Sequence, residues 1–446
     1  MIAFVLFPEL SAYNASFNFA RLLQKCGYAV AYICELRFRE HVERQGFSCL
    51  MVEEIVESTS PFTGPRVLRL WKMWRRFYQH KSFEDDKYAE LIAKLSGEGN
   101  ASLFIVDPLM WRLGAAAFQC GVPVINFNTS LAGPMDSRVP PIFSGLPPDL
   151  AETWPEQIRN VLLWRYHALL SWWKREGRHP LGCILTGMRP LEDAASKIKG
   201  AGTPLQWTEY GRRPSVSELV ASPPDFDIVR EPGTPTRIYL GACVDPDRLD
   251  EGDKWERRYP DLPLVYCSLG THAHRYKHAN RLYEAVLELG LQCPGLQVIL
   301  QVGNEMDPAK WRGLPARIRV RKFVPQLSVL KTATYFITHG GLSSIREAIY
   351  FGVPMLVFPC AQDQPGNAAR VERLGLGVRG EIAKITSVQL GDMIRSIDAG
   401  DSSREIRRMK DIYRAEGNCG QAVDLVRSLI IAAPIELCHV GERVGR

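Results

Sequence analysis

The sequence predicts an α/β protein of two units, each a parallel sheet with helices on both faces, joined by a linker. Short apolar runs typical of buried parallel strands alternate with helical patterns in residues 1–130, and again from residue 264. Between these halves, residues 222–263 are dense in proline, glycine and charge, as interdomain linkers are. The length of 446 residues also suffices for two domains.

The first half opens with a strand at Ile2–Phe7 and a helix that we expect Asn14 to cap and Gly27 to close. Further strands are predicted at Ala29–Cys34, Leu103–Val106, Val122–Phe127 and Arg237–Leu240. We therefore expect an N-terminal domain at 1–240, followed by a linker at 241–262.

The second half repeats the alternation. It begins with a strand, a glycine turn and a helix, at Leu264–Ser268, Gly270-Thr271 and His278–Leu289. Strands are then predicted at Leu296–Val302, Ile318–Lys322, Tyr335–Thr338 and Val353–Phe358. A basic and apolar helical pattern covers Ser402–Ala433. We place the C-terminal domain at 263–425 and a tail at 426–446.

Composition excludes several classes of protein. The net charge of +6 is mild and its basic residues are mostly spread out, which argues against a nucleic-acid binder. Eleven cysteines stand singly without the spacing of a zinc site, so we expect no metal and a reduced, cytoplasmic setting. The N-terminal apolar run lacks a basic flank and is too short for a signal peptide or a membrane span.

The most informative stretch runs from residue 323 to 367. Within it, His339-Gly340-Gly341 follows a buried strand and precedes a helix that we expect Ser343 or Ser344 to cap. Such a turn leaves backbone amides free at the positive end of the helix dipole, which suits a phosphate group. His339 stands at the mouth of the turn and would add another donor.

Polar and aromatic residues flank this turn. Asp363 and Gln364 follow the next strand, at the sheet edge where ligands of doubly wound folds bind, and they suit sugar hydroxyls. Phe323 offers a face for stacking a base. Glu347 is a candidate partner for ribose hydroxyls, although Ser344-x-x-Glu347 also matches a capping box, and the two roles are compatible.

Four pieces occur in order: FVPQ at 323–326, HGGLSSxxE at 339–347, GVPMLVFP at 352–359 and DQPGNA at 363–368. Together they resemble the donor-binding signature of the family 1 glycosyltransferases, the UDP-glycosyltransferases. This resemblance implies the GT-B architecture, in which two Rossmann-like domains face each other across an interdomain cleft. The first domain would bind the acceptor and the second the nucleotide sugar.

The resemblance also implies a reaction: inverting transfer of a hexose, with glucose favoured, from a UDP-sugar to a small lipophilic or aromatic acceptor, without metal or cofactor. It assigns the uracil to Phe323 and Gln326, and the ribose to Glu347. The diphosphate would meet His339, Gly341, Ser343 and Ser344, with the Gly270-Thr271 loop, and the sugar would meet Asp363 and Gln364. Phe323 and Ser343 replace the Trp and Asn of many relatives.

The catalytic base is the point where this sequence departs from the family. The family places a histidine in the turn after the first strand, where this chain has Ala12, while Asp107 matches the supporting aspartate. Three explanations stay open: the acceptor needs no strong base, another group acts, or the chain binds the nucleotide sugar without transferring it. The replacement groups are Asp107, Glu9, His272 and His274, of which we name Asp107 and His272 as catalytic candidates.

Other interpretations also stay open. Asp107 could cap the helix after its strand, and His272 could be a solvent-exposed loop residue. The chain could be a non-catalytic partner subunit, or a UDP-sugar epimerase or hydrolase. Two aromatic stretches, 66–81 and 154–174, are either core-facing helices with a solvated basic face, the lining of an acceptor pocket, or a patch on the inner face of a membrane.

Overall fold

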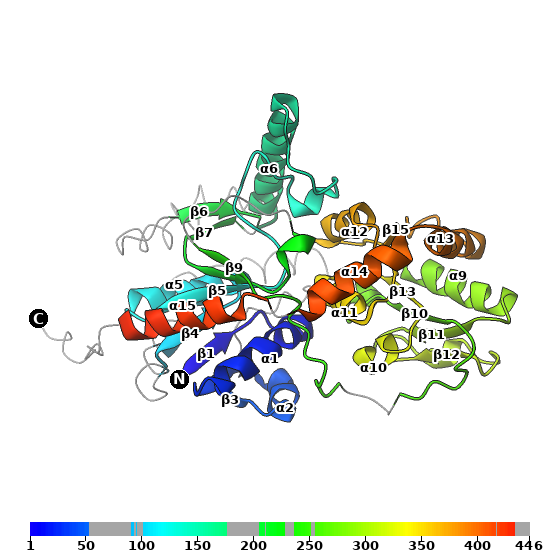
Figure 1. The fold of residues 1–446 in the computed structure, drawn as a ribbon, viewed down its shortest axis with the longest axis horizontal. Helices are drawn as coiled ribbons and strands as arrows, with labels where there is room; N and C mark the ends of the chain where they lie inside the picture. Colours follow the sequence, from blue (N-terminus) through cyan, green and yellow to red (C-terminus); the bar gives the residue numbers. More distant parts are fainter. Residues whose placement is uncertain are drawn as a thin grey trace, which may run out of the picture.

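The computed structural model describes residues 1–52, 91–92, 95, 101–175, 205–209, 211–227, 236–250, 255–415 and 417–432. It contains two α/β domains lying next to each other (Figure 1). The first is built on a seven-stranded parallel sheet in the order β3-β2-β1-β4-β5-β8-β9. Its strands are β1 (Ile2–Val5), β2 (Val30–Glu35), β3 (Ser48–Val52), β4 (Leu103–Val106), β5 (Val124–Asn128), β8 (Glu218–Val220) and β9 (Arg237–Tyr239).

The second domain has a six-stranded parallel sheet in the order β12-β11-β10-β13-β14-β15. Its strands are β10 (Leu264–Ser268), β11 (Gln297–Gln301), β12 (Ile318–Arg321), β13 (Tyr335–Thr338), β14 (Met355–Val357) and β15 (Gly377–Arg379). In each sheet the order reverses beside the first strand, at β1/β4 and at β10/β13. Ligands of doubly wound sheets bind at such switch points, outside the carboxyl ends of the strands.

Helices cover both faces of the two sheets. The first domain contributes α1 (Leu10–Lys25), α2 (Leu36–Arg44), α5 (Trp111–Gln119), α6 (Trp154–Arg175) and the short η1 (Pro108–Met110), η2 (Ile142–Ser144) and η3 (Pro224–Phe226), with a hairpin of β6 (Leu205–Thr208) and β7 (Gly211–Pro214). The second contributes η4 (Ala273–Arg275), α9 (Ala279–Gln292), η5 (Pro308–Lys310), α10 (Gln326–Leu330), α11 (Leu342–Phe351), α12 (Gln364–Arg373), α13 (Ser387–Ala399) and α14 (Ser402–Arg414). None of the helices in the described ranges is long and apolar enough to cross a membrane.

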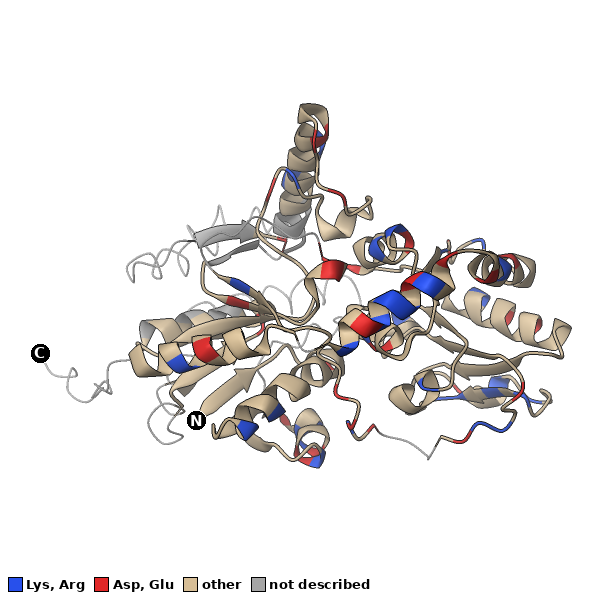
Figure 2. Cartoon of the chain, in the orientation of Figure 1, with Lys and Arg blue, Asp and Glu red and all other residues tan. Residues whose placement is uncertain are grey.

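The strands are apolar because both of their faces are covered. Every residue of β1, β4, β10 and β13 is buried. The strands of the first sheet carry few charges, and charged positions concentrate on helices and connections (Figure 2). Burial on both faces explains why these segments are continuous apolar runs and could be predicted as parallel strands.

The domains share packed contacts. The core around α10 and α11 includes Leu131, Ile142 and Phe226 of the first domain. A Cβ at Gly366, in α12, would collide with the backbone of Ile142, so α12 and η2 meet at a distance that only glycine permits. The last helix, α15 (Cys419–Ala432), packs into the core of the first domain. The two domains are therefore joined by packing as well as by the linker.

Three local predictions were wrong. Helix α1 begins at Leu10 with Glu9 as its N-cap, and Asn14 lies inside it, with its side-chain Oδ1 2.8 Å from Nε2 of His41. The N-cap of α11 is Gly341, because the glycine turn already supplies the extended backbone that precedes a helix, and no side chain caps it. The single helix predicted over 402–433 is two, α14 and α15.

The break between α14 and α15 has a steric cause. Ala415 leaves the helical conformation with φ −66° and ψ 151°. Gly417 then passes against the backbone of Leu240 and Gly241 so closely that no Cβ would fit. The chain crosses from the second domain to the first at this point.

Candidate active site

The centre of the site is the turn between β13 and α11. Gly340 has φ 86°, and a Cβ there would lie 2.8 Å from Val357. A Cβ at Gly341 would lie 2.6 Å from Nε2 of His339, so both glycines are required by conformation or space. Because no side chain caps α11, the first-turn amides are left for a ligand at the positive end of the helix.

His339 closes one side of this turn. Its ring stacks on Tyr276 with centroids 5.8 Å apart, and a Cβ on Gly270 would lie 2.9 Å from its Cε1. Burial, with a smaller contribution from His272, lowers the pKa of His339 to about 4, so the imidazole is neutral at pH 7. Its Nδ1 is buried and has no hydrogen-bond partner. An unsatisfied buried nitrogen beside free amides is a position for a ligand oxygen.

Gly270 and Thr271 approach this turn from the end of β10, which pairs directly with β13. Gly270 has φ 76°, and its amide donates to Oγ of Ser268 over 3.3 Å. His272 follows two residues after Gly270. Its Nε2 lies 3.2 Å from Oε1 of Glu9 in the first domain. Both side chains are more than one-third exposed. This contact brings together two of the groups proposed to replace the missing base.

Asp107 and Ala12 occupy less accessible positions. Asp107 is 2% exposed; its Oδ1 accepts from the amide of Leu109 over 2.8 Å, and its Oδ2 from the hydroxyl of Thr129 over 3.5 Å. The contact with Leu109 is that of a helix cap at η1. Ala12 is 4% exposed within the first-domain core. The capping interpretation of Asp107 thus fits the structure, and His272 is the more accessible of the two catalytic candidates.

The uracil and ribose candidates form one hydrogen-bond network. Nε2 of Gln326 donates to Oε2 of Glu347 over 2.6 Å, and also lies 3.4 Å from Oγ of Ser344. The hydroxyl of Tyr266 lies 3.3 Å from Oε1 of Gln326. The capping box is absent because the carboxylate of Glu347 is turned to other partners. Gln326, Ser344 and Glu347 therefore lie together in the structure.

Sequence reasoning missed Arg248, the main partner of Glu347. Its Nη1 donates to Oε1 of Glu347 over 2.7 Å, and its Nε to Oδ1 of Asp250 over 2.6 Å. The side chains of Arg248 and Glu347 are 3% and 5% exposed, so this is a buried ion pair. Arg248 lies in the linker, where an isolated charge follows no spacing that would have marked it.

Ser343 connects the two helix N-termini. Its hydroxyl donates to the carbonyl of Ser11 in the first turn of α1 over 3.1 Å, and accepts from Nη2 of Arg346 over 2.8 Å. The N-terminal ends of α1 and α11 therefore meet beside the glycine turn. Both ends favour negative charge at the same place.

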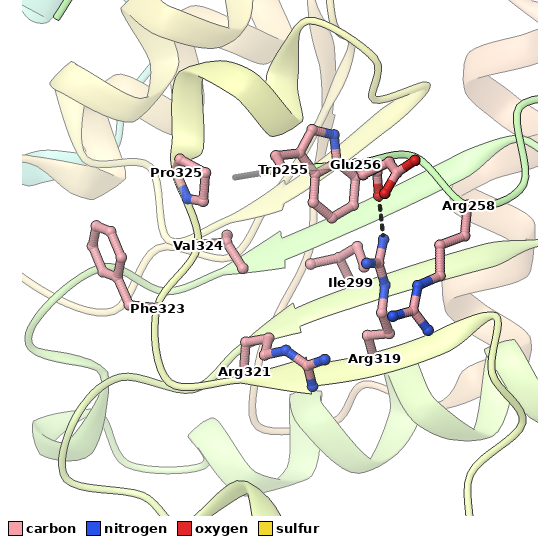
Figure 3. A pocket seen from close by; sticks show the side chains of 9 residues that line it. All are labelled: Trp255, Glu256, Arg258, Ile299, Arg319, Arg321, Phe323, Val324 and Pro325. Carbon is pink, nitrogen blue, oxygen red and sulfur yellow. Dashed lines mark hydrogen bonds between the residues drawn. The ribbon is translucent and has the colours of Figure 1, made fainter. Parts of the chain in front are cut away.

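Phe323, Asp363 and Gln364 complete the predicted set. Phe323 follows β12 and lines the pocket drawn in Figure 3, where its ring is turned away from the arginines. Asp363 precedes α12, and burial raises its pKa to about 6, while Nδ2 of Asn367 donates to its Oδ2 over 3.0 Å.

Gln364 accepts from the amides of Cys360 and Ala361 and donates to the hydroxyl of Tyr276 over 3.1 Å. Gln364 thus shapes the loop and supports the tyrosine on which His339 stacks.

Within the described residues, no three His, Cys, Asp or Glu side chains lie together in an arrangement that could hold a metal ion.

Known proteins share both the sequence signature and the fold. Residues 296–416 match the family described as Erythromycin biosynthesis protein CIII-like, C-terminal domain. The oleandomycin glycosyltransferase of Streptomyces antibioticus is 32% identical over 210 residues, 46% of this chain and 47% of that protein. The NDP-glycosyltransferase YjiC of Bacillus subtilis (strain 168) is 30% identical over 239 residues, 51% of this chain and 59% of that protein. The matches thus span about half of each relative.

Solved structures match over nearly the whole chain. The glycotransferase of kitacinnamycin superposes with a TM-score of 0.64 at 22% identity, covering 96% of this chain and 98% of that one. The glycosyltransferase VinC in complex with dTDP gives 0.63 at 18% identity, covering 97% and 100%. At these identities the likeness shows the fold, which is GT-B, as predicted. The family model and the relatives confirm the resemblance to family 1 glycosyltransferases.

Proposed function

We propose that this protein transfers a hexose from a UDP-sugar to a small lipophilic or aromatic acceptor, with inversion at the anomeric carbon. One observation carries the proposal. At the carboxyl ends of β10 and β13, the uncapped amides of α11, the unpartnered Nδ1 of His339 and the Gly270 turn converge. This arrangement suits a diphosphate, which is a double anion rich in acceptor oxygens. The relatives named above are glycosyltransferases, and the family match over residues 296–416 includes this turn.

The proposed chemistry needs a base on the acceptor side and donors on the leaving-group side. An acceptor oxygen attacks the anomeric carbon while the bond from that carbon to the phosphate oxygen breaks, and UDP leaves with the electron pair. His272 takes the acceptor proton, and Glu9, 3.2 Å away, stabilises the resulting imidazolium. The α11 amides and His339 stabilise the charge that develops on the diphosphate, so the residues present require no metal for this step.

Donor recognition would use the network around Glu347. Phe323 offers a stacking face, Gln326 an amide for the base, and Glu347 a carboxylate for ribose hydroxyls. Asp363 and Gln364 favour glucose among the hexoses by resemblance. One structural neighbour was solved with dTDP, so a thymidine-diphosphate sugar should be tested as a donor beside the UDP-sugars.

Mass spectrometry of a donor and acceptor panel tests the proposal. UDP-glucose, UDP-N-acetylglucosamine, UDP-glucuronate and dTDP-glucose are each incubated with phenols, carboxylic acids and lipophilic alcohols. We expect a glycosylated product with UDP-glucose and at least one lipophilic acceptor. Release or isomerisation of the sugar without acceptor would instead indicate a hydrolase or epimerase. UDP binding without any product, and co-purification with an active transferase, would indicate a partner subunit.

We also propose that α6 lies on the inner face of a membrane. Its outward face exposes five large apolar side chains at near-helical spacing, by 48–73%: Trp154, Ile158, Leu162, Tyr166 and Leu169. The opposite face holds the helix in place, with Nε1 of Trp164 donating to the carbonyl of Val139 over 2.8 Å. In Figure 1, α6 stands away from both sheets. Aromatic rings with nearby arginines suit an anionic lipid surface.

Sedimentation with vesicles of phosphatidylcholine and phosphatidylglycerol tests this contact. Leu162→Glu should abolish co-sedimentation, whereas Leu291→Glu, a charge placed on an exposed leucine of α9, should leave it intact. The proposal would be contradicted if Leu162→Glu bound the vesicles as well as wild type does. It would also be contradicted if the substitution changed only the oligomeric state of the protein. The other predicted contact, 66–81, lies outside the described residues.

A further inference from the structure

A pocket of about 190 Å³ lies beside the outer strand of the second sheet (Figure 3). The linker forms one wall with Trp255 and Arg258, and β12 contributes Arg319 and Arg321. Val324 and Pro325 form the opposite wall. Phe323, which precedes them, also lines the pocket, and Gln326 follows them, so the pocket includes part of the loop that would hold the base of the donor.

Three guanidinium groups converge on this pocket. Arg319 and Arg321 alternate along β12, which places both side chains on the same face of the sheet, and they pair in register with Ile299 and Gln301. Arg258 reaches the same space from the linker, which passes next to β12, and Figure 2 shows basic positions on both segments. In Figure 3 the guanidinium groups of Arg258 and Arg321 are directed toward Arg319, whose own guanidinium points to Glu256.

Arg319 is held in place by neutral contacts. Its guanidinium lies 4.4 Å from the ring centroid of Trp255, and its Nη2 donates to the backbone carbonyl of Glu256 over 3.2 Å. Its Nε is buried and has no hydrogen-bond partner. Stacking fixes the plane of the guanidinium, so its remaining donors keep a fixed direction.

The pocket lining sets three arginines against one carboxylate, Glu256. Within the described residues, none of them has a carboxylate at ion-pair distance. Burial lowers the pKa of Arg319, and Arg258 and then Arg321 lower it further, while Glu256 opposes this with the weakest effect. Among the described residues, the fold therefore gathers three arginines around a space that a single carboxylate, that of Glu256, also lines.

We propose that this pocket binds a compact oxyanion, a phosphate or a carboxylate group. An oxyanion accepts two parallel hydrogen bonds from a guanidinium fork, and it would supply both the missing negative charge and acceptors for the arginines. The occupied site would also fix the Val324–Pro325 wall. Since Phe323 itself lines the pocket and Gln326 follows that wall, the bound anion would change donor affinity through the loop that would hold the base.

Calorimetry at low ionic strength tests the proposal with inorganic phosphate and with citrate as probes. The protein is first saturated with UDP, so that a diphosphate site, if present, is filled. We expect saturable binding of at least one probe, weakened about tenfold by Arg319→Gln or Arg321→Gln. Arg312→Gln, which alters an exposed arginine outside the pocket, should bind as wild type does.

Each outcome has one meaning. Binding of phosphate alone, or of citrate alone, identifies which source of oxyanion the pocket selects. The proposal is overturned if neither probe binds saturably, or if Arg312→Gln weakens binding as much as the pocket variants do. The arginines would then serve only as charged side chains that keep an edge strand from pairing with another chain. Arg321 is exposed, so Arg321→Gln serves where Arg319→Gln fails to fold. UDP binding is recorded in the same titration, so failure of the proposed transferase function is seen separately.

Discussion

At the scale of single residues, the chain lacks a histidine at position 12 but holds one at position 272, across the domain boundary. Glu9 lies 3.2 Å from it, on the side of the first domain. This pairing could not be predicted from the sequence, because 263 positions separate the two residues. His339 and its glycine turn could be predicted, because one short segment contains them all.

His272→Ala should lower the rate of transfer at saturating substrates by about a hundredfold, because it removes the proton acceptor. Affinity for UDP should stay unchanged, since no donor contact is assigned to this side chain. Steady-state kinetics and calorimetry measure the two quantities. His274→Ala, which alters the neighbouring exposed histidine, is the control. A rate within about threefold of wild type would rule out His272 as the base.

Two buried histidines make stability depend on pH. Burial lowers the pKa of His41 and of His339 to about 4, from an unfolded value near 6.5. Below pH 6.5 the unfolded chain therefore binds more protons, and stability falls until pH 4. For His41, Arg248 and Arg44 add to the lowering and Asp250 opposes it. Asp363, with its raised pKa of about 6, acts in the opposite direction.

His41→Gln should flatten this dependence, because it removes one group that must stay neutral in the fold. Urea unfolding at pH 7 and pH 5 measures the difference. We expect wild type to lose more stability than His41→Gln over this interval. An equal loss in both proteins would mean that His41 does not contribute.

At the scale of elements, the linker is a structural part of the donor site. Arg21 pairs with Asp245 over 2.9 Å, and the side chain of Gln45 bonds both backbone groups of Leu249. On the other domain, Asp250 accepts from the amide of Leu327 over 3.3 Å. With Arg248 on Glu347, the segment 245–250 is fixed to both domains. Its proline and charge content predicted a connection, but its contacts depend on elements distant in sequence.

Arg248→Met should destabilise the protein by about 3–5 kcal/mol, because it leaves the carboxylate of Glu347 buried without its partner. Combining it with Glu347→Gln should recover much of this loss, since the buried charge is then gone. Denaturant unfolding measures both. Arg39→Met, which breaks an exposed pair with Glu43, should cost no more than about 1 kcal/mol. Equal effects at the buried and exposed pairs would contradict the assigned role of Arg248.

The misplaced cap of α11 shows a limit of local patterns. Serine is a favoured N-cap, and two serines stand at the start of this helix. The glycine turn nevertheless begins the helix earlier, at Leu342, whose side chain is 4% exposed. Packing of Leu342 into the core places the helix start, and both serines then face the site.

At the scale of the whole molecule, the site depends on two domains held together. The fold could be predicted because continuous apolar strands and a long ordered signature both lie along the sequence. Two of the contacts between domains could not, since Ser343 with Ser11 and Arg248 with Glu347 each join segments far apart in the chain. These contacts decide which groups can meet across the site.

The central claim is that the turn at His339 binds the diphosphate of a uridine nucleotide. Titration calorimetry of UDP into the wild-type protein tests it most directly, with His339→Ala and Glu347→Ala measured beside it. We predict saturable binding at one site, weakened more than about tenfold in each variant. A wild-type protein without measurable affinity for UDP would contradict the claim.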